Sequence, residues 1–220
     1  MEPVDVSPRH RSTLPLRFSD ASPSIFRRPP GRWFHGLLLG PFGLALHAAS
    51  FPAGWESMWL WFASLPILAA AGVWALRVIT YLVARSKRRA AGSAWRFLIA
   101  PAMGLLLVGL IATSVPLRVR WWQGRGDFER ALASAPAAST DRTEWTNFDV
   151  PESLGTYTII DADRVGEAVI FAEATGSGVL DDAGFAYLPS GPFQELDTGW
   201  FESPRFVALG GGWYAWTASW

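Results

Sequence analysis

The acidic segment Asp161–Gly166 comes closest to a reactive site by the type and spacing of its residues. It has acids at its first and third positions and a glycine at its sixth, as at the start of a calcium-binding loop. Val165 and Ala172 stand at the fifth and twelfth positions, where such a loop needs oxygen ligands. The pattern therefore favours a hairpin turn over a metal site.

A second acidic pair, Asp181-Asp182, has the residue types needed for carboxylate-dependent hydrolysis. Glycoside hydrolysis requires two carboxylates that face each other across a cleft, whereas neighbours on a strand point to opposite faces. A solvated turn is the better interpretation of this pair.

Catalysis by a nucleophile and a base has little support. The only histidines are His10, His35 and His47, the only lysine is Lys87, and there is no cysteine. Residues 118–220 therefore cannot form a Ser-His-Asp triad, and thiol catalysis and cysteine-based metal sites are excluded. The motifs favour a protein that is not an enzyme, and we expect no catalytic, metal or cofactor site.

A run of three glycines, Gly210-Gly211-Gly212, is not a phosphate-binding loop. It lacks the lysine and the following helix that such a loop needs. The run predicts a turn or bulge that opens the last strand.

Composition divides the chain into two halves. Of 220 residues, 50% are apolar and 17% charged, which suits a chain that lies partly in lipid. Residues 1–117 hold twelve basic and four acidic side chains, whereas residues 118–220 hold seven and fifteen. The two halves are therefore expected to face different surroundings.

Three apolar segments have the length and composition of transmembrane helices, at about residues 33–51, 57–83 and 97–117. The last has no charge, and the first is the weakest. An alternative for the first is a signal peptide with its apolar core at Gly36–Leu46 and a cleavage site near Ala49.

The basic residues predict the orientation. Loop 85–96 carries five of them and the N-terminal 35 residues carry six arginines. By the positive-inside rule both are cytoplasmic, so residues 118–220 lie outside. We predict a multi-pass plasma-membrane protein in which residues 1–32 are a disordered cytoplasmic tail.

Two ionisable residues inside the predicted spans, His47 and Arg77, are candidate functional residues, because charge in lipid is costly. His47 lies near the outer boundary and Arg77 is able to extend to the cytoplasmic head groups, so positions at the interfaces explain both more simply. The small residues of Gly36–Gly40 and the pair Ala100 and Gly104 suit close helix packing within the three-helix unit, and they also permit a homodimer.

The outer half predicts a juxtamembrane helix and linker at 118–149 and a small domain at 150–220. Pro116 is expected to end the last span, and residues 127–134 to form a short helix. Apolar runs separated by turn residues predict four or five antiparallel strands. The predicted strands include Tyr157–Ile160, Ala168–Ala172, Gly184–Leu188, Phe206–Leu209 and Trp213–Thr217, with a predicted turn at Gly176–Gly178.

Three short motifs in this half, at Leu154–Tyr157, Gly184–Tyr187 and Leu209–Trp216, resemble a group of uncharacterised actinobacterial integral membrane proteins. The resemblance covers about residues 100–220, and the final Gly-Gly-Gly-Trp-Tyr strand is its most specific part. It implies helices followed by an outer domain, and it implies no activity.

The sequence as a whole predicts three transmembrane helices followed by a small extracytoplasmic α+β domain with an antiparallel sheet. We expect this acidic, aromatic-rich domain to bind a partner protein or an envelope component, with Trp213, Tyr214 and Trp216 as candidate contacts. One alternative is an accessory subunit of a transporter or envelope enzyme that acts through its helices, and another is an outer-face hydrolase. Lipid is an expected partner, and nucleic acid is not, because the domain is acidic.

Overall fold

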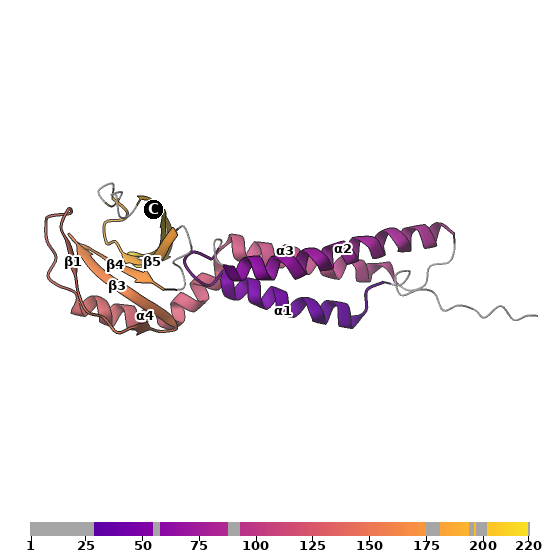
Figure 1. Cartoon of the computed structure of the whole chain (residues 1–220), viewed down its shortest axis with the longest axis horizontal. Coiled ribbons are helices and arrows are strands. Elements are labelled where there is room, and N and C mark those ends of the chain that lie inside the picture. Colours follow the sequence, from indigo (N-terminus) through magenta and orange to yellow (C-terminus); the bar gives the residue numbers. More distant parts are fainter. Residues whose placement is uncertain are drawn as a thin grey trace, which may run out of the picture.

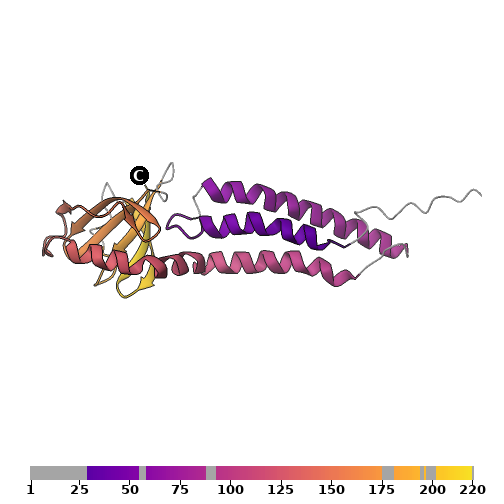
Figure 2. The same cartoon turned by 90° about the horizontal axis from the view of Figure 1, so that it is seen from below.

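The computed structural model describes residues 29–54, 58–87, 93–174, 181–193, 196 and 202–219. The molecule is elongated, with a bundle of helices at one end and a curved sheet at the other (Figure 1). Seen from below, one line of helix runs along the whole molecule and joins its two parts (Figure 2). The predicted N-terminal tail falls almost wholly outside the described residues.

The helical bundle consists of α1 (Arg32–Ala48), α2 (Met58–Ser86) and α3 (Ile99–Ala112), the last preceded by the short 3-10 helix η2 (Ala94–Leu98). Two of these stretches are long and apolar enough to cross a membrane, Trp59–Ser86 and Ala94–Ala112, each with a mean hydropathy of 1.9. Only 11% of the most apolar window of each is buried. Unlike the core helix of a soluble protein, they present most of their apolar side chains outward.

Small residues let the three helices approach one another. Ala45 of α1, Ala63 of α2 and Leu107 and Ile111 of α3 form a common buried cluster. The glycines of the predicted packing motif do not take part, since an added Cβ at Gly36 or Gly40 would meet nothing within 4 Å. The expectation that they pack inside the bundle is therefore wrong, and a homodimer through them stays a prediction.

The helix that follows α3 connects the two parts of the molecule. α3 ends at Ala112, the chain turns through Ser114 in the left-handed conformation (φ 53°), and α4 begins at Val115 and continues to Ser134. The expectation that Pro116 ends a helix is wrong. It stands in the first turn of α4, where a proline costs no hydrogen bond. The predicted short helix at 127–134 is the end of this longer one.

Within the described residues the sheet has seven strands rather than four or five, all of them paired antiparallel, which confirms the predicted antiparallel sheet domain. Its order is β1-β3-β4-β5-β7-β6, with β2 paired to β3 alone. The strands are β1 (Trp145–Asn147), β2 (Ser153–Leu154), β3 (Tyr157–Val165), β4 (Ala168–Glu173), β5 (Asp181–Tyr187), β6 (Glu202–Gly210) and β7 (Trp213–Ser219).

Two predicted acidic turns are strands. β3 continues through Asp161, which pairs with β4, and Asp163, which pairs with both β1 and β4, and the chain turns only after Val165. Asp181 and Asp182 begin β5 and pair with β7. In both places the pairing with neighbouring strands overrides the turn preference of aspartate. The predicted turn at 176–178 lies outside the described residues.

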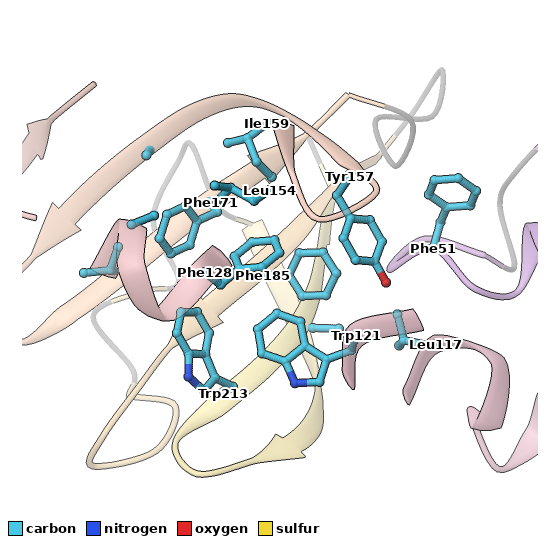
Figure 3. Packing of buried hydrophobic residues seen from close by; sticks show 14 residues of the cluster. Phe51, Leu117, Trp121, Phe128, Leu154, Tyr157, Ile159, Phe171, Phe185 and Trp213 are labelled. Carbon is cyan, nitrogen blue, oxygen red and sulfur yellow. The ribbon is translucent and has the colours of Figure 1, made fainter. Parts of the chain in front are cut away.

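Both faces of the sheet are covered. On one face α4 contributes Leu117, Trp121, Phe128 and Ala131 to an aromatic core (Figure 3). Their spacing of four, seven and three residues places them on one side of the helix. The sheet contributes residues that alternate along the strands: Leu154, Tyr157, Ile159, Ala162, Val169, Phe171, Phe185, Trp213 and Ala215. The opposite face buries a second cluster around Val165, Ile170, Leu188, Leu196 and Trp216.

Candidate functional site at the junction of helices and sheet

A tight turn of the sheet domain rests directly on α4. Gly155, between β2 and β3, has φ 63°, and a Cβ there would lie 2.6 Å from the Cα of Gly124. Only glycine permits this conformation and this approach together. Asp127, one helical turn further on, accepts a hydrogen bond from the backbone N–H of Gly155 at 2.8 Å. The turn is thereby fixed, and it places Thr156 and Tyr157 beside the start of α4.

Arg120 of α4 joins this turn to the loop after α1. Its Nε and Nη2 donate to the hydroxyl and carbonyl oxygens of Thr156, at 2.8 and 2.5 Å. Its Nη1 donates to Oγ of Ser50 at 3.1 Å. The guanidinium carbon also lies 3.9 Å from the ring centroid of Phe51 and 4.5 Å from that of Tyr157. One cation therefore contacts α4, the sheet domain and the α1–α2 loop.

The loop after α1 reinforces the same junction. Tyr157 donates its phenolic O–H to the carbonyl oxygen of Ser50 at 3.3 Å, and its ring meets that of Phe51 edge to face at 6.3 Å. Ser50 in turn donates to the carbonyl oxygen of His47 at 2.6 Å. In Figure 3 the ring of Tyr157 lies between the aromatic core and Phe51. The hydrogen bond from Tyr157 to Ser50 joins residues that are 107 positions apart in the chain.

Charge at the junction is partly shielded from water. Burial lowers the pKa of Arg120, while Tyr157 and the buried carboxylate of Glu173 act in the opposite direction. Burial raises the pKa of the Tyr157 phenol well above its usual range, against the attraction of Arg120. The phenol therefore stays protonated and donates its hydrogen bond, and Arg120 remains the cation of the site.

A cavity of about 520 Å³ opens beside Arg120. Its walls come from the end of α1, the end of α3, the start of α4 and the glycine turn. They are mostly apolar, with polar groups from His47, Arg120, Gln123 and Thr156. The lining residues are Leu46, His47, Leu110, Val115, Pro116, Val119, Arg120, Gln123 and Thr156. We call this cavity the junction crevice.

The structure separates the two candidate residues of the spans. His47 is exposed near the end of α1, lines the junction crevice, and meets Phe51 edge to face at 5.3 Å. Arg77 is half-buried in α2, with its guanidinium carbon 5.5 Å from the ring centroid of Phe34 at the start of α1. Its Nε has no hydrogen-bond partner among the described residues. Since Phe34 and His47 are thirteen residues apart on one helix, His47 and Arg77 lie about 20 Å apart along the bundle.

The three aromatic residues of the last strand lie in different surroundings. Trp213 is 2% exposed and lies against Trp121 in the aromatic core. Trp216, 3% exposed, belongs to the second cluster and donates to the carbonyl oxygen of Phe185 at 3.2 Å. Tyr214 is half-buried. The two tryptophans stabilise the sheet, and a partner would reach their rings only if the sheet domain opened.

The acidic residues form no metal site in the part of the chain that the structure describes. Asp161 accepts a hydrogen bond from the side chain of Asn147, on β1. Burial and the neighbouring Asp161 raise the pKa of Asp163. These carboxylates lie along β3 and bind the sheet's own residues, consistent with a structural role.

The sequence indicates only one part of this junction. Arg120 follows the last predicted span, 97–117, and therefore falls on its predicted outer side. Its partners were missed, because Ser50 is 70 and Thr156 36 positions away in the chain. The one local signal was Gly155 inside the motif Leu154–Tyr157, since an isolated glycine between strand residues often marks a close backbone approach.

No family model matches the chain, and neither do any curated proteins or solved structures.

Proposed function

We propose that this chain is a multi-pass plasma-membrane protein whose outer domain binds a component of the cell envelope or a partner protein at the membrane surface. The observation that carries membrane insertion is the outward-facing apolar surface of Trp59–Ser86 and Ala94–Ala112. In water such a surface would be far larger than soluble proteins expose. In a lipid bilayer the same apolar surface contacts acyl chains and needs no burial against other protein.

In this proposal α1 is a third span. It has 17 residues, and its buried Ala45 packs in the same cluster as α2 and α3. This packing favours a retained helix over a cleaved signal. The basic residues of loop 85–96 support a cytoplasmic N-terminus and a sheet domain on the outer side.

The junction supports a binding role for the outer domain. Arg120, Gly155 and Tyr157 hold the sheet domain in a fixed place against the outer ends of the helices. The junction crevice is therefore a preformed site at the predicted membrane surface, with one cation on its wall. Its residues offer binding groups, and the Thr156 hydroxyl is hydrogen-bonded to Arg120 rather than to His47, which favours a binding protein over an enzyme.

Topology is testable with single cysteines, because the native chain has none. We expect Ala133→Cys, exposed on α4, to react with a membrane-impermeant maleimide in intact cells. Ser86→Cys, exposed at the end of α2, should react only after the cells are opened. The reverse pattern would overturn the orientation, and labelling of both in intact cells would overturn the proposed spans.

Binding is testable by photo-crosslinking in native membranes. A photoreactive amino acid at Gln123, on the wall of the crevice, should capture a discrete partner that mass spectrometry identifies. The same group at Thr143, exposed in the segment before β1, is the matched control. Equal, diffuse capture at both positions would count against a site at the junction.

A further inference from the structure

We propose that the junction crevice binds an anionic phospholipid of the outer leaflet, with its phosphate at Arg120 and the start of an acyl chain against the apolar wall. The inference rests on the proposed function, since it requires the helices to lie in a membrane. It goes further by assigning the chemical class of a ligand and the residues that select it.

The first argument is position. The crevice lies where α1 and α3 end and α4 begins, which is the outer boundary of the two apolar stretches. Trp122, on the next position of α4 beyond the buried Trp121, is 78% exposed. An exposed tryptophan at this level is typical of the lipid head-group region. Lipid is therefore present at the mouth of the crevice at high local concentration.

The second argument is the apolar wall. Leu46, Leu110, Val115 and Val119 come from three helices and face one space of about 520 Å³. Cavities of this size suit small organic ligands. A free inorganic anion gains no binding free energy from such an apolar wall, whereas an acyl chain does. The wall thus points to an amphiphile.

The third argument is charge. Arg120 uses one proton on each of its three nitrogens for Ser50 and Thr156, so the second proton of Nη1 and of Nη2 has no acceptor among the described residues. A guanidinium with two protons free matches the geometry of a phosphate. Gln123 adds an amide donor, and none of the nine lining residues is acidic. The polar groups of the crevice therefore select for negative charge.

The experiment compares lipids bound to the purified full-length protein. The protein is reconstituted in nanodiscs made from equal amounts of phosphatidylglycerol and phosphatidylcholine, released, and analysed by native mass spectrometry. We expect retained phosphatidylglycerol to exceed phosphatidylcholine by about fivefold, the factor for one basic residue at an anionic surface. Soluble glycerol phosphate in excess should not displace it, which separates a lipid from a free phosphate.

Two pairs of variants locate the site. Gln123→Glu adds a carboxylate to the crevice and should abolish the preference, while Ala133→Glu adds the same charge further along the exposed side of α4 and should leave it. Val119→Trp fills the crevice from an exposed position and should lower the amount of lipid retained. Leu106→Trp, on the exposed side of α3, is its control.

Three outcomes overturn the inference: no preference in the native protein, equal loss in Gln123→Glu and Ala133→Glu, or displacement by glycerol phosphate. Extraction at alkaline pH tests membrane insertion separately. A protein that resists extraction yet retains no phosphatidylglycerol refutes the lipid site alone. A protein that is extracted refutes the proposed function itself.

Discussion

The contact between Gly155 and Gly124 predicts a specific loss of stability in Gly155→Ala. The new methyl group would lie 2.6 Å from the Cα of Gly124, and the residue has φ 63°. Gly211, in the turn between β6 and β7, also has φ 63°, but a Cβ there would meet only the flexible end of the Arg125 side chain, at 3.1 Å. The two substitutions share the backbone strain and differ in the close approach.

The magnitudes follow from these two terms. An alanine in the left-handed conformation costs about 1 kcal/mol, which both variants incur. Forcing a methyl group into a packed backbone contact costs about 2 kcal/mol more, and only Gly155→Ala incurs it. We therefore expect losses of about 1 kcal/mol for Gly211→Ala and about 3 kcal/mol for Gly155→Ala.

Pulse proteolysis of the full-length protein in nanodiscs, over a series of urea concentrations, measures the free energy of unfolding of the sheet domain. Loss of the domain's protease-resistant fragment marks the transition. If both variants lose the same free energy to within about 0.5 kcal/mol, the backbone contact between α4 and the turn does not carry the stability assigned to it.

The same assay tests three further substitutions. Arg120→Gln should destabilise the sheet domain by about 2 kcal/mol, because it removes charged hydrogen bonds to the turn and the loop, whereas Arg118→Gln on the exposed side of α4 should change it by less than about 0.5 kcal/mol. Phe128→Ala should cost about 4 kcal/mol, because this ring is fully buried in the aromatic core, and a loss below about 1 kcal/mol would contradict that packing. The folded state raises the pKa of Asp163 above its value in the unfolded chain. This carboxyl therefore lowers the free energy of unfolding as the pH rises above the unfolded-state pKa. Asp163→Asn should therefore stabilise the protein at pH 7 and remove the loss of stability that begins as the pH rises above about 4, the ordinary pKa of an aspartate, and Asp149→Asn, at an exposed position, should change neither.

The apolar helices could be predicted because their signal is local. The segment predicted at 57–83 overlaps α2, and the segment predicted at 97–117 overlaps η2 and α3 but extends beyond Ala112 into the start of α4. The break at Thr113 and Ser114 was missed, since no proline or charge directly precedes it. It shows only in the structure, where Thr113 hydrogen-bonds back to Gly109 at 2.7 Å and Ser114 takes the left-handed conformation.

The sheet was harder to predict because its strands depend on distant partners. Asp161 and Asp163 have a local preference for turns, yet β3 carries them between β1 and β4. The buried Ala162 and Val165 are too small a signal to reveal this. By contrast, the last turn was predicted correctly, because Gly211 and Gly212 both have positive φ, which a run of glycines favours.

The sequence predicts where the junction lies along the chain but not which side chains make its contacts. The aromatic side chains of β7 show why. Trp213 and Tyr214 are neighbours in an apolar strand, so composition alone gave both as candidate contacts. Burial separates them, since a strand sends alternate side chains to opposite faces and α4 covers one of these. The helix that covers this face was hidden in a segment that the sequence divides into a span, a linker and a short helix.

The shared use of α4 has a consequence for how the protein is made. In the proposed topology, α4 follows directly from the last span, and its Trp121 and Phe128 form one wall of the sheet domain's core. The strands that close this core are synthesised afterwards and have no apolar face to fold against until α4 has crossed the membrane. Completion of the sheet on the outer side would then oppose any backward slip of the last span, so that folding of the domain itself secures the orientation of the helices.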